Sequence, residues 1–186
     1  QFVYIASYVG VYSEGNLKTA QGGNATHNFA TMACINSGCY WEVKAISIDV
    51  NRSYIGVIAD GEQDSASSAG ATYQMVKKMI LTNSSGFITT TAVSGPGEYE
   101  GVVGFADGDI IGCAYKEGEI WFHKNGVWMG SGNPDDGAMS VQMAAEGAAK
   151  DDTLHWIPIC GYNSSFSANF GQGDMEGENN YTDSGG

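Results

Sequence analysis

The run GDIIGCAYKEGEIWFHKNG, residues 108–126, indicates the structural class of this chain. Two apolar segments, 109–115 and 119–124, are separated by a Lys-Glu-Gly turn and followed by Asn125-Gly126. The first segment is apolar on both faces, and the second alternates between two faces as a β-strand does. Asn-Gly is the strongest short signal for a hairpin, because Gly126 tolerates the positive φ that the tight turn needs. The run predicts consecutive antiparallel strands.

Short strands of the same kind are predicted along the rest of the chain, at 40–48, 54–59, 72–82, 87–93, 127–129, 156–162 and 165–170. In the first of these, Ile46 and Ile48 break the alternation, which a β-bulge or burial of both faces would explain. Helical periodicity is confined to 139–150, so we expect at most one short helix or an irregular loop there.

This pattern favours an all-β fold, namely an antiparallel β-sandwich with long loops, over its alternative, a closed barrel. The sandwich is preferred because strands such as 110–114 are apolar on both faces, as if they were covered twice. A length of 186 residues indicates one domain. The content of 27 glycines and only 16% charged residues, against about 25% in average proteins, agrees with many turns and few exposed helices.

The net charge of −13 excludes several classes of partner. A chain this acidic repels nucleic acid and anionic membrane surfaces. No apolar run is long enough to cross a membrane, so we expect no membrane insertion. The sequence also lacks the nucleophile-elbow, dinucleotide-binding and phosphate-loop motifs, and its histidines show no metal-ligand spacing, which argues against an enzyme.

Four segments in order resemble the SPRY domain family: CYWEV at 39–43, YIGV at 54–57, the run at 108–126, and IPI at 157–159 with NFGQ at 169–172. The resemblance implies a concanavalin-like sandwich of two sheets over residues 1–172. A polar tail at 173–186 would follow, truncated from a longer chain. It also implies a binding module without catalytic residues.

A narrower resemblance, to SPRY domains of bacteriophage and other viral structural proteins, is carried by EGNL at 14–17 and GVWMGSGNP at 126–134. It implies a non-catalytic module on the virion surface, in a tail fibre, head fibre or capsid decoration. Such a module would be extracellular and would bind a host receptor or a neighbouring virion protein through loops, within an appendage that could be a homo-oligomer. The alternatives are a glycan-binding or glycan-cleaving domain and a spacer without a ligand. Inserts at 61–70 and 135–152 depart from the cellular pattern, so ligand contacts of cellular members are not carried over.

Aromatic side chains are the candidate binding residues. Trp121 and His123 lie on the strand face opposite Ile120 and Phe122, and Trp128 follows the hairpin. An exposed Trp suits stacking on sugar rings or docking into a partner. Alternatively, a second layer or the N-terminal strand covers these residues. Tyr99, in a Gly-Pro-Gly loop, is a similar candidate at a loop tip.

Acidic residues at Asp60, Glu62 and Asp64 alternate as calcium ligands do, but the Gly and distal Glu of a full calcium loop are missing. Calcium is therefore the one cofactor that we consider, against a merely solvated loop. Cys34 and Cys39 flank a four-residue loop. They could form a disulfide across a hairpin or remain as two reduced thiols.

Overall fold

The computed structural model describes residues 2–3, 11–13, 18–20, 27–30, 38–49, 53–59, 79–83, 88–90, 104–116, 119–132, 134–135, 155–161 and 164–170. The candidate helix at 139–150 and the polar tail at 173–186 lie outside these residues. The helical element within them is η2 (Met129–Ser131), a short 3-10 turn.

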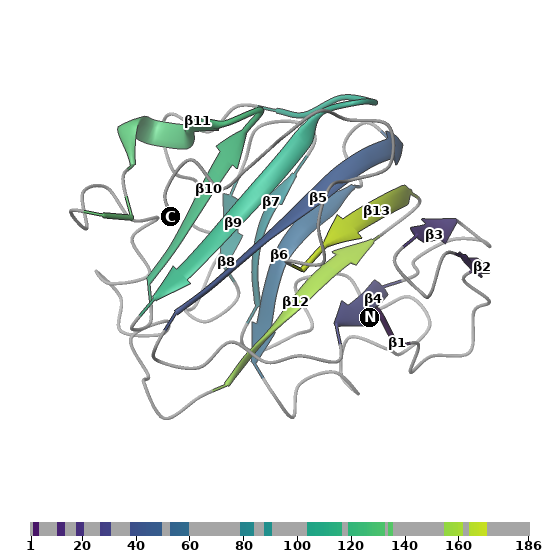
Figure 1. The fold of residues 1–186 in the computed structure, drawn as a ribbon, viewed down its shortest axis with the longest axis horizontal. Coiled ribbons are helices and arrows are strands. Elements are labelled where there is room, and N and C mark those ends of the chain that lie inside the picture. The colour runs from purple at the N-terminus through teal and green to yellow at the C-terminus, as the bar shows by residue number, and fades with distance from the viewer. Residues whose placement is uncertain are drawn as a thin grey trace.

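The described strands form two sheets, drawn in Figure 1. Sheet A has six strands in the order β1 (Phe2–Val3), β4 (His27–Ala30), β12 (Trp156–Gly161), β6 (Tyr54–Ala59), β7 (Met79–Asn83) and β8 (Ile88–Thr90). Sheet B has seven, in the order β11 (Val127–Trp128), β10 (Glu119–Lys124), β9 (Ile110–Lys116), β5 (Cys39–Ser47), β13 (Ser165–Asn169), β3 (Lys18–Ala20) and β2 (Val11–Ser13). All strand pairs among the described residues are antiparallel, so the predicted sandwich class is confirmed.

The core lies between the two sheets, where alternate side chains of each sheet meet. Sheet B contributes Trp41, Phe122 and Phe166, and sheet A contributes Ile55 and Trp156, all of them almost fully buried. Burying such large apolar side chains is the main favourable term in folding. The sandwich therefore follows from strands that each present one continuous apolar face.

Both sheets are also buried on parts of their second face. On sheet A, Ile58 and Ile159 alternate with the core residues and are nonetheless buried. On sheet B, the same is true of Ile110 and Trp121. The expectation that some strands are buried on both faces is confirmed. This burial determines whether the candidate aromatic residues described below are exposed.

The break in alternation within β5 is a β-bulge. Ser47 pairs with Ser165 and Ala45 pairs with Phe166, so Ile46 is the extra residue in the ladder. A bulge leaves one residue unpaired and turns its side chain out of the regular pattern. Ile46 lies on the outer face together with Glu42 and Lys44 and is 43% exposed, whereas Ile48, after the bulge, packs against the core.

The Asn-Gly hairpin between β10 and β11 forms as predicted. Asn125 has a φ of 51° and Gly126 a φ of 81°, the two positive values of a type I′ turn. The turn aligns His123 with Trp128 and Lys124 with Val127. β11 is the end strand of sheet B, so the hairpin lies at one edge of this sheet (Figure 1).

Candidate functional site

A lateral row of residues crosses sheet B on the face turned away from the core. Trp128, His123, Gly112, Glu42 and Asn169 are consecutive register partners on β11, β10, β9, β5 and β13. Residues in one register row share a face of the sheet, so their side chains lie next to one another. His123 and Glu42, 81 positions apart in the chain, are thereby separated only by Gly112.

Gly112 is required for this arrangement. A Cβ at position 112 would overlap the imidazole ring of His123, which lies directly over the glycine. The missing side chain opens a slot in which the imidazole extends from β10 across β9 toward β5. The presence of Gly112 inside a strand thus has a structural reason, close packing of a neighbouring ring.

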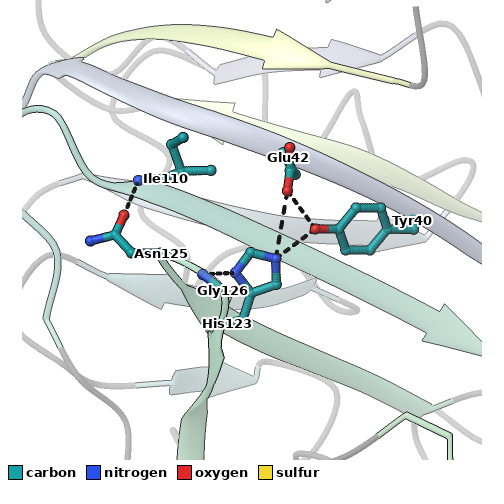
Figure 2. A network of polar contacts seen from close by, with 6 residues as sticks. All are labelled: Tyr40, Glu42, Ile110, His123, Asn125 and Gly126. Carbon is teal, nitrogen blue, oxygen red and sulfur yellow. Dashed lines mark hydrogen bonds and ion pairs between the residues drawn. The ribbon is translucent and has the colours of Figure 1, made fainter. Parts of the chain in front are cut away.

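A directed chain of hydrogen bonds fills the slot, as Figure 2 shows. The Gly126 N–H donates to His123 Nδ1 at 3.1 Å. Because Nδ1 accepts, a neutral ring carries its proton on Nε2, which donates to the Tyr40 hydroxyl at 2.6 Å. The Tyr40 hydroxyl in turn donates to Glu42 Oε1 at 2.6 Å. The hairpin turn is therefore connected to β5 through the His123 side chain.

Ring contacts hold the imidazole on both sides. The Tyr40 ring stacks on it with centroids 5.9 Å apart and an interplanar angle of 22°. Trp128 meets it edge-on, with centroids 4.9 Å apart and an angle of 89°. Edge-to-face and offset-stacked contacts of this kind fix ring orientation as well as bury area.

The buried position of His123 keeps its imidazole neutral. Burial lowers the pKa of His123 from its ordinary value of 6.5 to about 4, because the charged ring would lose its hydration. Glu42 Oε1 lies 3.8 Å from Nε2 and would form an ion pair with a protonated ring. That pairing is the weaker effect, because the Tyr40 hydroxyl lies within hydrogen-bond distance of both groups and Nδ1 is already occupied by the Gly126 N–H.

A second polar cluster fastens the other side of the turn to the start of β9. Asn125 Oδ1 accepts the Ile110 N–H at 2.8 Å, and Asn125 Nδ2 donates to Asp109 Oδ1 at 2.7 Å. Lys124 Nζ lies 3.0 Å from the other Asp109 oxygen. Burial raises the pKa of Asp109, but hydrogen bonds from the Ala106 backbone, Asn125 and Lys124 outweigh it and lower the pKa overall. The Asp109 carboxylate is therefore held ionised beneath the turn.

The structure corrects the expectation that Trp121 and His123 are exposed binding residues. Trp121 is 2% exposed and His123 is 3% exposed, so neither offers a ring face to a sugar or a partner. The alternation of β10 correctly separates them from Ile120 and Phe122, but the second face is covered as well. Trp128 is half-buried, with its ring in contact with His123. Beside it, Val127 is 72% exposed.

The other predicted site residues lie mostly outside the described part of the chain. This holds for Tyr99, for the calcium candidates Asp60, Glu62 and Asp64, and for Cys34. Cys39 is disulfide-bonded, and Cys34, its predicted partner, lies outside the described residues. Within the described residues, no group of three or more His, Cys, Asp and Glu side chains could hold a metal ion.

The remaining cysteines belong to the interior. Cys113 and Cys160 are free and buried in the core between the sheets. Burial raises the pKa of both thiols, and for Cys113 the proximity of Cys160 and Glu42 adds to the effect. Because the thiolate is the reactive form, these thiols are suited to packing and not to catalysis.

Sequence reasoning missed Tyr40 and Glu42 as partners of His123. Glu42 was visible as a polar residue on the second face of its strand, and Gly112 as a glycine inside an apolar strand. The signal that could have joined them is the register of the three strands β10, β9 and β5, which places all of them in one row.

The two polar clusters join the hairpin to β5 and to the start of β9. His123 and Glu42 are both 3% exposed and are engaged with each other through Tyr40. A general base must reach the proton of a bound substrate, which this ring does not do. In the part of the chain that the structure describes, no helix is long and apolar enough to span a membrane.

No protein-family model matches the sequence, and no curated protein matches it either. Among solved structures, the SPRY domain of human HERC1 is similar with a TM-score of 0.58 and 15% sequence identity, over 89% of this chain and 94% of that chain. The TRIM65 PSpry domain is similar with a TM-score of 0.56 and 10% identity, over 90% of this chain and 88% of that chain. These comparisons give no link to phage or viral proteins. At such identities they establish architecture alone: the two antiparallel sheets form the β-sandwich of the SPRY fold.

Proposed function

We propose that this chain is a non-catalytic recognition module that binds a protein partner through the hairpin tip and neighbouring loops, and that it is carried on a virus particle. The recognition role rests on a SPRY-type sandwich in which His123 and Glu42 are buried beneath the hairpin. SPRY domains are generally protein-recognition modules without catalytic residues, which is consistent with this arrangement.

The hairpin tip has the properties of a contact surface. Val127 is 72% exposed, and Trp128 is partly accessible beside it. Large apolar and aromatic side chains of this kind dominate the energy of protein interfaces when a partner covers them. The turn beneath them is held rigidly by His123 and Asp109, so binding would cost little ordering entropy.

The location on a virus particle is supported by the sequence resemblance to viral SPRY domains and by disulfide-bonded Cys39. Disulfides persist in oxidising surroundings such as the extracellular space and virion surfaces. The glycan-directed alternative rested on an exposed tryptophan together with acidic loops. Trp121 is buried, which removes the first ground, and the acidic loop at 60–64 lies outside the described residues, so this alternative is not retained. Calcium at Asp60, Glu62 and Asp64 stays a prediction, to be tested by adding calcium to EDTA-treated protein and recording the melting temperature.

A position-specific photo-cross-linker tests both parts of the proposal. The probe is placed at Val127, and the matched control carries it at Lys116, which is exposed at the opposite end of the β9–β10 pair. We expect adducts with a virion protein or a host surface protein from position 127 and few from position 116. Equal labelling from both positions would overturn the hairpin surface. Absence of the chain from purified particles of its source would overturn the viral location, and a chain with no adduct at either position would be a spacer.

A further inference from the structure

Asn125-Gly126 is the single Asn-Gly pair in the sequence, and it carries an intrinsic chemical lability. In a flexible chain, the backbone nitrogen of Gly126 can attack Cγ of Asn125. A bond between that nitrogen and Cγ forms, the bond from Cγ to Nδ2 breaks, and ammonia leaves with the glycine proton. Water then opens the cyclic imide at either carbonyl, which yields aspartate or isoaspartate. Glycine makes this step easy because it has no side chain to hinder the approach.

The closed hairpin prevents the ring closure geometrically. The five-membered imide needs the Gly126 nitrogen on the same side of the Cα–C bond as the Asn125 Cβ. Asn125 has a φ of 51° in a type I′ turn, the left-handed region in which ψ is about +30 to +60°. At such ψ values the next nitrogen lies on the side opposite to Cβ. Attack therefore requires the turn to open and Asn125 to leave this conformation.

Both reacting groups are also occupied in the closed turn. The side-chain amide of Asn125 is held at Oδ1 by the Ile110 N–H and at Nδ2 by Asp109, at 2.8 and 2.7 Å. The attacking nitrogen, that of Gly126, donates its proton to His123 Nδ1 at 3.1 Å. The lability of the pair is thus suppressed by contacts that come from β9 and from β10.

We propose that Asn125 is a latent site of self-modification. The hydrogen-bonded hairpin protects it, and Asn125 converts to aspartate or isoaspartate when the hairpin opens. The conversion needs only water, and it is irreversible. Because Asn125 is exposed at the turn, water reaches the imide as soon as it forms.

The product would prevent the turn from closing again. An acid at position 125 loses the Nδ2 donor and places a carboxylate next to Asp109, which is held ionised by Lys124. Like charges at hydrogen-bond distance repel, and an isoaspartate also lengthens the backbone of a two-residue turn. Conversion would therefore release the exposed tip that carries Val127 and limit the lifetime of that surface.

The first test compares the folded chain with the same full-length chain unfolded in urea, at one pH and temperature. Peptide mapping by mass spectrometry and enzymatic methylation of isoaspartate measure conversion at Asn125, and the Asn-Ser pair at Asn83 serves as a reference for the unfolded arm. We expect Asn125 in the folded chain to convert at about one tenth of its rate in the unfolded chain, or at a still lower rate, because the reaction proceeds only through the locally open state. Equal or faster conversion in the folded chain would overturn the proposal.

The second test removes single contacts of the turn. His123→Leu removes the acceptor of the Gly126 N–H, and Asp109→Ala removes the acceptor of Asn125 Nδ2. Two variants are used so that, if one of them fails to fold, the other still decides the test. Lys116→Ala is the control, because Lys116 is exposed at the opposite end of the β9–β10 pair and its replacement leaves both turn contacts in place. Loss of one hydrogen bond should speed conversion about two- to tenfold by favouring the open turn. Unchanged rates in both folded turn variants, or an equal increase in the control, would refute the protective role of these contacts.

Discussion

Acidification should weaken the native state through one identifiable group, the buried imidazole of His123. Its pKa is lowered to about 4 in the folded chain, whereas an exposed histidine in the unfolded chain titrates near 6.5. Between these two values the unfolded chain binds a proton that the native chain does not. The contribution of His123 to the free energy of unfolding is therefore fully present above about pH 6.5 and is lost progressively as the pH falls toward 4. Below that value both states bind the proton, and the free energy no longer changes through this group.

The size of this effect follows from the difference between the two pKa values. A difference of 1 pH unit corresponds to about 1.4 kcal/mol, so His123 should account for a loss of about 3 kcal/mol in the free energy of unfolding between pH 6.5 and 4. Glu42 reduces the loss, because its carboxylate lies 3.8 Å from Nε2 and favours the protonated ring. We therefore treat about 3 kcal/mol as an upper bound.

The assay is urea unfolding at a series of pH values, followed by tryptophan fluorescence, for the natural chain and for His123→Gln. Carboxyl groups titrate in both proteins, so the difference between their pH profiles isolates His123. His155→Gln is the matched control, because the His155 side chain is exposed. We expect the profile of His123→Gln to be flatter between pH 4 and 6.5 and that of His155→Gln to follow the natural chain. Parallel profiles for the natural chain and His123→Gln would refute the reasoning.

Three further substitutions test the row on sheet B and the hairpin. Gly112→Ala should lower the free energy of unfolding by about 1–3 kcal/mol because its Cβ overlaps the His123 ring, and denaturant unfolding should show a smaller cost in a His123→Ala background. Tyr40→Phe should cost about 1–3 kcal/mol in the same assay, because it removes a donor to buried Glu42; no measurable cost would contradict the hydrogen-bond chain. Val127→Lys should change stability by less than about 0.5 kcal/mol while reducing binding to any partner cross-linked at that position; intact binding would argue against the hairpin surface.

Local chemistry made several elements predictable. The bounds of β6 and β10 agree with those read from alternation and turn residues, and the Asn125-Gly126 turn has the positive φ angles that its residues favour. The break in phase at Ile46 is a bulge, one of the two explanations considered. Each of these features depends on neighbours within a few residues, so the sequence expresses it directly.

The candidate site was predicted only in part. His123 and Trp128 are brought together, as their positions beside the hairpin suggest, but Trp121 is buried and His123 acts inside the molecule. Alternation distinguishes two faces of a strand and does not say whether a second layer covers the outer one. Exposure of Trp121 was therefore a question that the pattern of β10 left open.

The sequence alone determined the strands with clear alternation, such as β6 and β10, the hairpin turn and the two-sheet class, because these depend on periodicity and on the conformational preferences of Asn and Gly; β3 and β4, which are short, were not predicted. Only the tertiary structure decided that His123 meets Tyr40 and Glu42. That meeting depends on the order and register of β10, β9 and β5, which join residues about 80 positions apart, and on the slot that Gly112 leaves between them. Pairing over such separations is set by the packing of the whole sandwich, and no local stretch of sequence encodes it.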